Sequence, residues 1–153
     1  MAISRSCPMR IVVRDLDAPF EDSPVGYMEW VCESLGIVTG RDVNKTAITL
    51  FRVIVEKSDY RCGISSTELA EELSMSRGAV INQLNKLIEC GLIRKSGRNY
   101  TLRGGNLTRT MMEIRGDFDR LFERLEKAAT YMDNCFGFPR ENKIYKKFRC
   151  FND

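Results

Sequence analysis

The cysteines have the most reactive side chains in this sequence, and their spacing argues against a metal or catalytic site. The six of them are scattered from Cys7 to Cys150 without a CxxC pair, and the chain has no histidine. Because structural zinc sites need closely spaced Cys or His ligands, we expect no metal ion and no other cofactor. Scattered cysteines of a reducing compartment are mostly small buried hydrophobes. A redox or metal response of Cys62, Cys135 or Cys150 is kept as an alternative.

Catalytic motifs are also absent from the sequence. It contains no GxSxG, HExxH, Walker or GxGxxG motif, and without histidine no cysteine–histidine pair can form. Paired carboxylates occur at Glu71 and Glu72 and at Asp117 and Asp119, on helix-like segments where solvent exposure explains them. The sequence therefore predicts a protein that is not an enzyme.

The chain is long enough for about one domain with its own hydrophobic core. It has 153 residues, of which 43% are apolar and 29% are charged, as is typical of a folded soluble protein. Its apolar runs are too short to span a bilayer, and the N-terminus lacks the apolar stretch of a signal peptide. We therefore expect a cytoplasmic location and no membrane partner.

Positive charge is concentrated in one block, residues 74–109. The block holds seven basic side chains and one acidic one, a local charge of +6, whereas the whole chain carries +3. A basic block in an otherwise acidic chain is typical of a nucleic-acid-binding surface. A solvated run of charges is the alternative, and the elements around the block decide between the two.

Two helices are predicted ahead of this block. Ser23 followed by Pro24 is a typical helix start, so we expect a short helix over 25–35. Apolar residues that recur at the 3.6-residue period predict a second helix over about 42–57. Nearer the N-terminus, a short strand is expected at 9–16.

Two capped helix starts then follow in quick succession. Ser65 and Glu68 have the spacing of a capping box, and Ser76 can cap the next helix. Only about three residues, 74–76, connect the two helices, and so short a turn forces a sharp angle between them. Gly91 suits the position just after the second helix.

A basic hairpin is predicted directly after these helices. The stretches LIRK (92–95) and NYTL (99–102) have the composition of strands, and they flank a short turn that contains Gly97. A helix, a tight turn, a second helix and a basic hairpin follow one another in a winged helix-turn-helix.

Residues 66–102 resemble the core of winged helix-turn-helix transcription regulators of the arsenic-sensor (ArsR) and multiple-antibiotic-resistance (MarR) types. Their sequence is STELAEELSMSRGAVINQLNKLIECGLIRKSGRNYTL. The shared pattern ELA..L..SR..V...L..L...GLI is matched at Glu68, Leu69, Ala70, Leu73, Ser76, Arg77, Val80, Leu84, Leu87, Gly91, Leu92 and Ile93. The resemblance extends over roughly 43–103 and implies a winged-helix fold that binds DNA.

Three departures from the family pattern qualify what the resemblance implies. Ser74 stands where the turn usually has glycine, and Ile81 stands where a small polar residue is common. The cysteine-rich metal motif of the arsenic sensors is missing from 70–78, so metal sensing at that place is not implied.

The expected fold class is mainly α with a small β-hairpin. Residues 1–41 form an N-terminal extension with a short helix, 42–105 the winged helix-turn-helix domain, and 106–137 a long dimerisation helix. A basic and aromatic tail at 138–153 follows, and it either folds back as a strand against 9–16 or contacts DNA.

The expected partner is double-stranded DNA, with a recognition helix at 76–90 in the major groove and a wing at 92–103 on the backbone or minor groove. Asn and Gln side chains can pair with adenine and Arg with guanine, whereas hydroxyls, small residues at a helix N-terminus and wing cations suit phosphates. The expected contact residues are Ser65, Ser66, Thr67, Ser76, Arg77, Gly78, Ala79, Asn82, Gln83, Lys86, Arg94, Lys95, Arg98 and Asn99.

The C-terminal third carries an apolar seam with alternating steps of four and three residues, which is typical of a coiled coil. A helix of roughly 42 Å at 1.5 Å per residue is too long for one small domain to cover. We therefore expect a homodimer on an inverted-repeat operator, with packing on the chain's own 25–35 helix as the alternative. The expected interface residues are Leu107, Met111, Ile114, Phe118, Leu121, Phe122, Leu125, Ala128, Met132 and Cys135.

The function that these patterns predict is that of a sequence-specific, dimeric DNA-binding regulator of transcription. The alternative of another class is a winged-helix module that mediates protein–protein contacts in a larger assembly. Salt-sensitive DNA binding distinguishes the two, because only the first function needs it.

Overall fold

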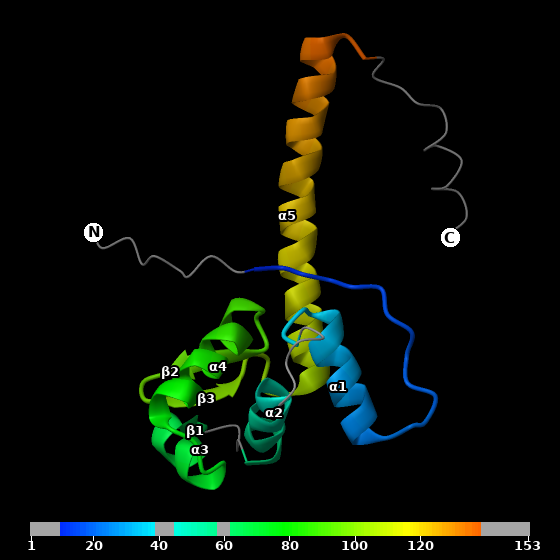
Figure 1. Ribbon diagram of the computed structural model, residues 1–153. Helices are drawn as coiled ribbons and strands as arrows, with labels where there is room; N and C mark the ends of the chain where they lie inside the picture. The colour runs from blue at the N-terminus through cyan, green and yellow to red at the C-terminus, as the bar shows by residue number, and fades with distance from the viewer. Residues whose placement is uncertain (1–9, 39–44, 58–61, 139–153) are drawn as a thin grey trace. The chain divides into compact units, whose positions relative to one another are not determined.

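Within residues 10–38, 45–57 and 62–138, the part that the computed structural model describes, the chain forms five helices and a three-stranded antiparallel sheet (Figure 1). This confirms the predicted fold class. The elements in chain order are α1 (Pro24–Ser34), α2 (Thr46–Lys57), β1 (Ile64–Ser65), α3 (Ser66–Glu72), α4 (Arg77–Glu89), β2 (Ile93–Ser96), β3 (Asn99–Leu102) and α5 (Leu107–Phe136).

The chain divides into two compact units inside α5. The first unit contains residues 1–114 and the second 115–153. The core, the sheet and α1 to α4 all belong to the first unit. Of the tail expected at 138–153, only Phe138 is among the described residues, so the two hypotheses for the tail lie outside them.

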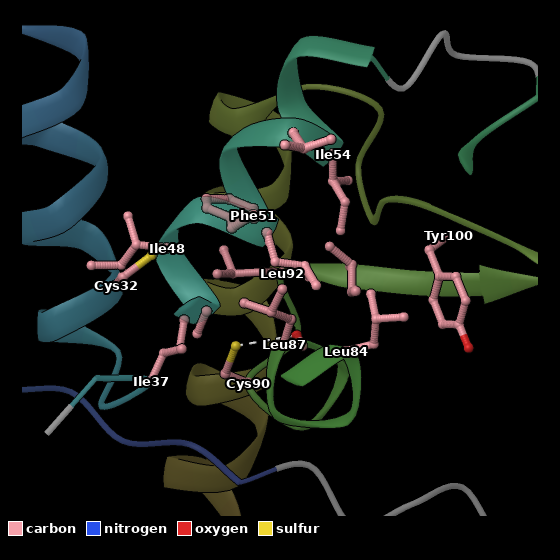
Figure 2. Packing of buried hydrophobic residues seen from close by; sticks show 14 of the residues in the cluster. Cys32, Ile37, Ile48, Phe51, Ile54, Leu84, Leu87, Cys90, Leu92 and Tyr100 are labelled. Carbon is pink, nitrogen blue, oxygen red and sulfur yellow. Dashed lines mark hydrogen bonds between the residues drawn. The ribbon is translucent and has the colours of Figure 1, made fainter. Parts of the chain in front are cut away.

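The core of the first unit forms where α2 packs on α4 and on β3. Figure 2 shows Phe51 and Ile54 of α2 beside Leu87 of α4 and Leu92, which follows that helix. All four side chains are essentially inaccessible to solvent. Each buried side chain of this size contributes about 1.5–3 kcal/mol relative to its exposed state, so this cluster fixes the position of α4.

The sheet has the order β1-β3-β2 and is antiparallel throughout. The hairpin β2–β3 was predicted, whereas β1 was not. Ile64 of β1 is paired with Tyr100, and both side chains are buried. The chain before β1 approaches β3 so closely that a Cβ on Gly63 would lie 2.7 Å from the carbonyl oxygen of Tyr100.

The short strand predicted at 9–16 is wrong for its described residues, 10–16. This segment forms no strand. The main-chain N–H of Arg10 instead donates to the carbonyl of Glu89 at 2.9 Å, and that of Arg14 donates to the carbonyl of Ser34 at 2.8 Å. Helix C-termini leave their last carbonyls without partners inside the helix, and the segment satisfies one such carbonyl on α4 and one on α1.

The predicted helix start at Ser23 and Pro24 is confirmed. The hydroxyl of Ser23 accepts a hydrogen bond from the N–H of Gly26 at 2.9 Å, and Pro24 occupies the first turn. The helix is α1, which contacts α2 and buries Cys32 against the core. Neither α1 nor any other helix in residues 10–38, 45–57 and 62–138 is long and apolar enough to cross a membrane.

The beginning of α5 is tied to the end of the hairpin. The side chain of Asn106 accepts from the N–H of Arg109 at 2.8 Å, and the hydroxyl of Thr110 accepts from the N–H of Gly104 at 3.0 Å. A Cβ on Gly104 would lie 2.6 Å from the nitrogen of Thr110, so only glycine allows this approach. Thr110 and Ile114 are the two α5 residues buried in the described structure.

Candidate nucleic-acid interface

The turn between α3 and α4 is short and fully hydrogen-bonded. After α3, the N–H of Ser74 donates to the carbonyl of Glu71, and the N–H of Met75 donates to that of Ala70. These two bonds are the Schellman arrangement at a helix end. It requires a left-handed residue, and Ser74 has φ +50°. Ser74 therefore occupies a backbone position that glycine adopts more readily, and the resemblance likewise leads us to expect glycine at this place in the turn.

Both helices of the pair begin at the predicted caps. Ser65 and Glu68 form the capping box in both directions, with bonds of 3.2 and 2.8 Å. The hydroxyl of Ser76 accepts from the N–H of Ala79 at 3.2 Å and starts α4. At the other end, Gly91 has φ +82°, as its predicted place after the helix requires.

The inner side of α4 is fixed by Val80, Leu84 and Leu87, all fully buried. Residues three and four positions apart share one helix face, and Asn82 and Asn85 lie outside the face that these three residues form and are exposed. This arrangement leaves a polar face on a helix whose position and rotation are set by packing.

The exposed face of α4 carries Gly78, Asn82 and Asn85, flanked by the half-buried Gln83 and Lys86. No atom lies within 4 Å of a Cβ built on Gly78, so the surface in front of the first turn is open. Asn85 was missed from the sequence, although its position three residues after Asn82 places both on one face.

Gln83 has an unusual environment. Its amide oxygen is buried, and within the described part of the chain it has no hydrogen-bond partner. A buried polar atom without a partner costs about 1–3 kcal/mol. This oxygen is enclosed by its own chain and is not presented to a ligand in this side-chain conformation.

The hydroxyl residues at the start of α3 lie in different environments. Ser66 is only 6% exposed, and its hydroxyl accepts from Nε of Arg77 at 3.4 Å. In this structure the Ser66 side chain therefore positions Arg77 instead of facing solvent. Thr67 is exposed, whereas Ser65 is half-buried with its hydroxyl engaged in the capping box.

The hairpin presents its cations to solvent on β2 and in the turn that follows. Ile93, Tyr100 and Leu102 are buried, whereas Arg94, Lys95 and Arg98 are exposed. These last three, with Asn99, are the residues expected to contact DNA from the wing. Gly97 has φ +61° in the turn, which lets the chain reverse direction between β2 and β3 at the predicted place.

Two of the wing side chains have contacts within the domain, one inside the hairpin and one with the chain before β1. The ammonium of Lys95 lies 5.8 Å from the centre of the Tyr100 ring, a cation–π contact that leaves the charge at the surface. The amide of Asn99 donates to the carbonyl of Cys62. Asn99 is thus half-buried and joins the hairpin to the chain before β1.

The cysteines of the described residues fall into two classes. Cys32 and Cys90 are buried, and burial raises the pKa of their thiols from about 9 to about 12 and about 11. Both therefore stay protonated near neutral pH and behave as small apolar groups. Cys62 and Cys135 are exposed. In residues 10–38, 45–57 and 62–138, no cluster of three or more acidic, Cys or His side chains is arranged to hold a metal ion.

The predicted apolar seam of α5 is partly covered by its own chain. Ile114 is 7% exposed and belongs to the core of the first unit, with Met111 packed against it. Leu107 lies 38% exposed at the start of the helix. In the second unit, Phe118 and Leu121 are half-buried and the rings of Phe118 and Phe122 stack at 4.6 Å. The remaining seam residues are exposed, and they are Phe122, Leu125, Ala128, Met132 and Cys135.

A comparison with protein families supports what this geometry indicates. A family model described as winged helix-turn-helix DNA-binding matches residues 60–94, the stretch that contains α3, α4 and the start of β2. No curated protein and no solved structure matches the chain. Together with the observed fold, the match supports a winged helix-turn-helix domain in the first unit of this chain.

Proposed function

We propose that this chain is a sequence-specific DNA-binding regulator of transcription that acts as a cytoplasmic homodimer, in the manner of the ArsR and MarR types. The observation that carries the proposal is the exposed polar face of α4 beside a cationic wing, in a domain that matches winged helix-turn-helix DNA-binding proteins. Direct base reading needs side chains of defined position, and α4 is held at both ends and along its inner side.

The two parts of this surface are expected to have different tasks. Asn82 and Gln83, with Asn85 beside them, carry amides that can pair with adenine in the major groove, and Arg77 can pair with guanine. The wing cations and the hydroxyls near the start of α3 suit backbone phosphates, which give affinity without sequence preference.

The dimer follows from the exposed stripe of α5. Leu125, Met132 and Phe122 are about half exposed, and a contiguous apolar stripe of this kind marks an interaction site. A second copy with the same stripe can cover it by two-fold symmetry. Two recognition helices would then address half-sites about one DNA turn apart, as an inverted repeat requires.

The proposal is tested by selecting bound fragments from random double-stranded DNA and then measuring affinity over a salt series. Asn82→Ala should change the selected sequence, whereas Arg98→Ala should weaken all fragments alike and lower the salt slope by about 1. Lys127→Ala, which removes an exposed cation of α5, is the matched control for net charge. If the wild-type chain shows no salt-dependent DNA binding, the domain is a protein–protein module instead.

A further inference from the structure

A groove of about 400 Å³ lies on the first unit between residues 10–14, the end of α1 and the C-terminal half of α4. Its polar lining comes from Arg10 and Arg14 on one side and from Asn82, Lys86 and Glu89 of α4 on the other. Asn82 and Lys86 were expected to contact DNA, whereas neither arginine was. The groove is therefore continuous with the exposed face of α4.

The segment that carries the two arginines is held in place by main-chain contacts. The N–H groups of Arg10 and Arg14 donate to carbonyls at the ends of α4 and α1, as described above. Between them, Val12 packs over Gly36 so closely that a Cβ there would lie 2.8 Å from Cγ1 of Val12. None of these contacts uses an arginine side chain, so within the described part of the chain both guanidinium groups remain available for a ligand.

The charge of the groove favours an anion. It contains three cations, Arg10, Arg14 and Lys86, and one carboxylate, that of Glu89. Both arginines are exposed, and within residues 10–38, 45–57 and 62–138 none of the three cations forms an ion pair. Like charges that line a concave surface attract anions more strongly than the same charges on a flat one, and the planar guanidinium group suits phosphate oxygens.

The position of the groove indicates which anion it binds. Figure 1 shows the segment after residue 10 passing the end of α4 that is remote from α3, in agreement with the bond between Arg10 and Glu89. From Asn82 to Glu89 the helix rises by about 10 Å, which is close to the roughly 12 Å width of the major groove. A duplex whose bases meet Asn82 therefore brings a phosphate strand near the far end of the helix.

We propose that residues 10–14 are a second DNA-contacting element, in which Arg10 and Arg14 bind backbone phosphates next to Lys86. The inference rests on the proposed function and extends its surface from the wing and α4 to the N-terminal extension. It predicts that the extension contributes affinity and salt dependence, and that the base preference stays with α4.

The test compares the full chain with the double variant Arg10→Ala/Arg14→Ala on the selected DNA over a salt series. The slope of log K against log salt should fall by up to about 2 per chain, at roughly 0.9 per phosphate contact, while the selected sequence is unchanged. The double variant Arg10→Lys/Arg14→Lys should retain most of the slope because it keeps the charge. Arg115→Ala/Arg124→Ala, which removes two exposed arginines of α5, controls for net charge.

Three results would overturn the inference. The first is an equal loss of slope in the groove variant and the control variant, since the effect would then be one of overall charge. The second is a shift of groove resonances by inorganic phosphate together with an unaltered DNA slope, because the groove would then bind a small ion only. The third is wild-type chain without salt-dependent DNA binding. That last result refutes the proposed function as well, and it is seen in the wild-type chain before any variant is measured, so the two failures can be told apart.

Discussion

Leu125→Asp tests the stripe of α5 as the contact between two copies. Leu125 is 52% exposed, and full burial of a leucine contributes about 1.5–3 kcal/mol. Covering the exposed half is therefore worth about 1 kcal/mol per chain, or about 2 kcal/mol per dimer. The loss of these 2 kcal/mol alone raises the dissociation constant of the dimer about 30-fold. Burying the two carboxylates of the variant weakens the dimer by several kcal/mol more, because both must be desolvated.

Sedimentation equilibrium over a range of chain concentrations measures this effect directly. The control is Thr130→Asp, which adds the same charge to an exposed position of α5 that is about 140° away from Leu125 around the helix. We expect the dimer to weaken only with Leu125→Asp. If both variants weaken the dimer equally, or if the wild-type chain is a monomer throughout the micromolar range, the argument from the exposed stripe is refuted.

Three further predictions concern the domain and its thiols. Ser74→Gly should raise the free energy of unfolding by about 0.5–1 kcal/mol, because Ser74 has φ +50° and glycine adopts that conformation freely; an unchanged or lower urea midpoint would contradict this. The thiols of Cys32 and Cys90 have pKa values raised to about 12 and about 11. Stability that is present below pH 9 should therefore be lost as the pH rises from 9 to about 11 for Cys90 and to about 12 for Cys32, by up to about 1.4 kcal/mol per pH unit and thiol. The loss should be smaller in Cys32→Ala/Cys90→Ala, and equal pH profiles would refute the assignment. Maleimide labelling, read out by peptide mass spectrometry, should modify Cys62 rapidly. Cys135 should react only at concentrations where the chain is monomeric, because the proposed dimer covers it. Labelling of Cys90 in the folded chain at the rate of Cys62 would contradict its burial.

Local sequence signals predicted three helix starts and the hairpin turn, whereas α2 begins at Thr46 and not near residue 42 as expected. The caps at Ser23, Ser65 and Ser76 and the turn at Gly97 depend on residues at most a few positions apart, and such local interactions are visible in the sequence. β1 was missed because a strand of two residues has no periodicity. Its existence depends on pairing with Tyr100, far along the chain.

The strand expected at 9–16 was wrong for a related reason. The β-branched residues Ile11, Val12 and Val13 suit an extended chain, but a strand also requires a free sheet edge beside it. The main chain of Arg10 and Arg14 finds helix carbonyls instead. The role of the two arginines in the groove could not be foreseen, because the contact between residue 10 and residue 89 is invisible in the local pattern.

The composition of the candidate site was predictable only for side chains that face solvent. Asn82, Arg94 and Arg98 were identified by residue type and by their place on the expected helix and wing, and all three are exposed. Ser66 and Asn99 have equally suitable side chains, yet each is engaged by another part of the domain. Tertiary hydrogen bonds of this kind decide which polar residues are available to a ligand, and they cannot be derived from spacing.

The way α4 is anchored explains why this helix suits the reading of bases. Its first turn is capped by Ser76, its last carbonyl groups are satisfied by the turn at Gly91 and by the N–H of Arg10, and its inner side is buried. A helix fixed at these three places loses little conformational entropy when it binds DNA. The free energy of its polar contacts is therefore not offset by a cost of ordering the helix. The wing cations Arg94, Lys95 and Arg98 are exposed side chains, which suits phosphate contacts because these depend on charge more than on geometry. The proposed division between base reading by α4 and phosphate binding by its flanks agrees with this difference between the two elements.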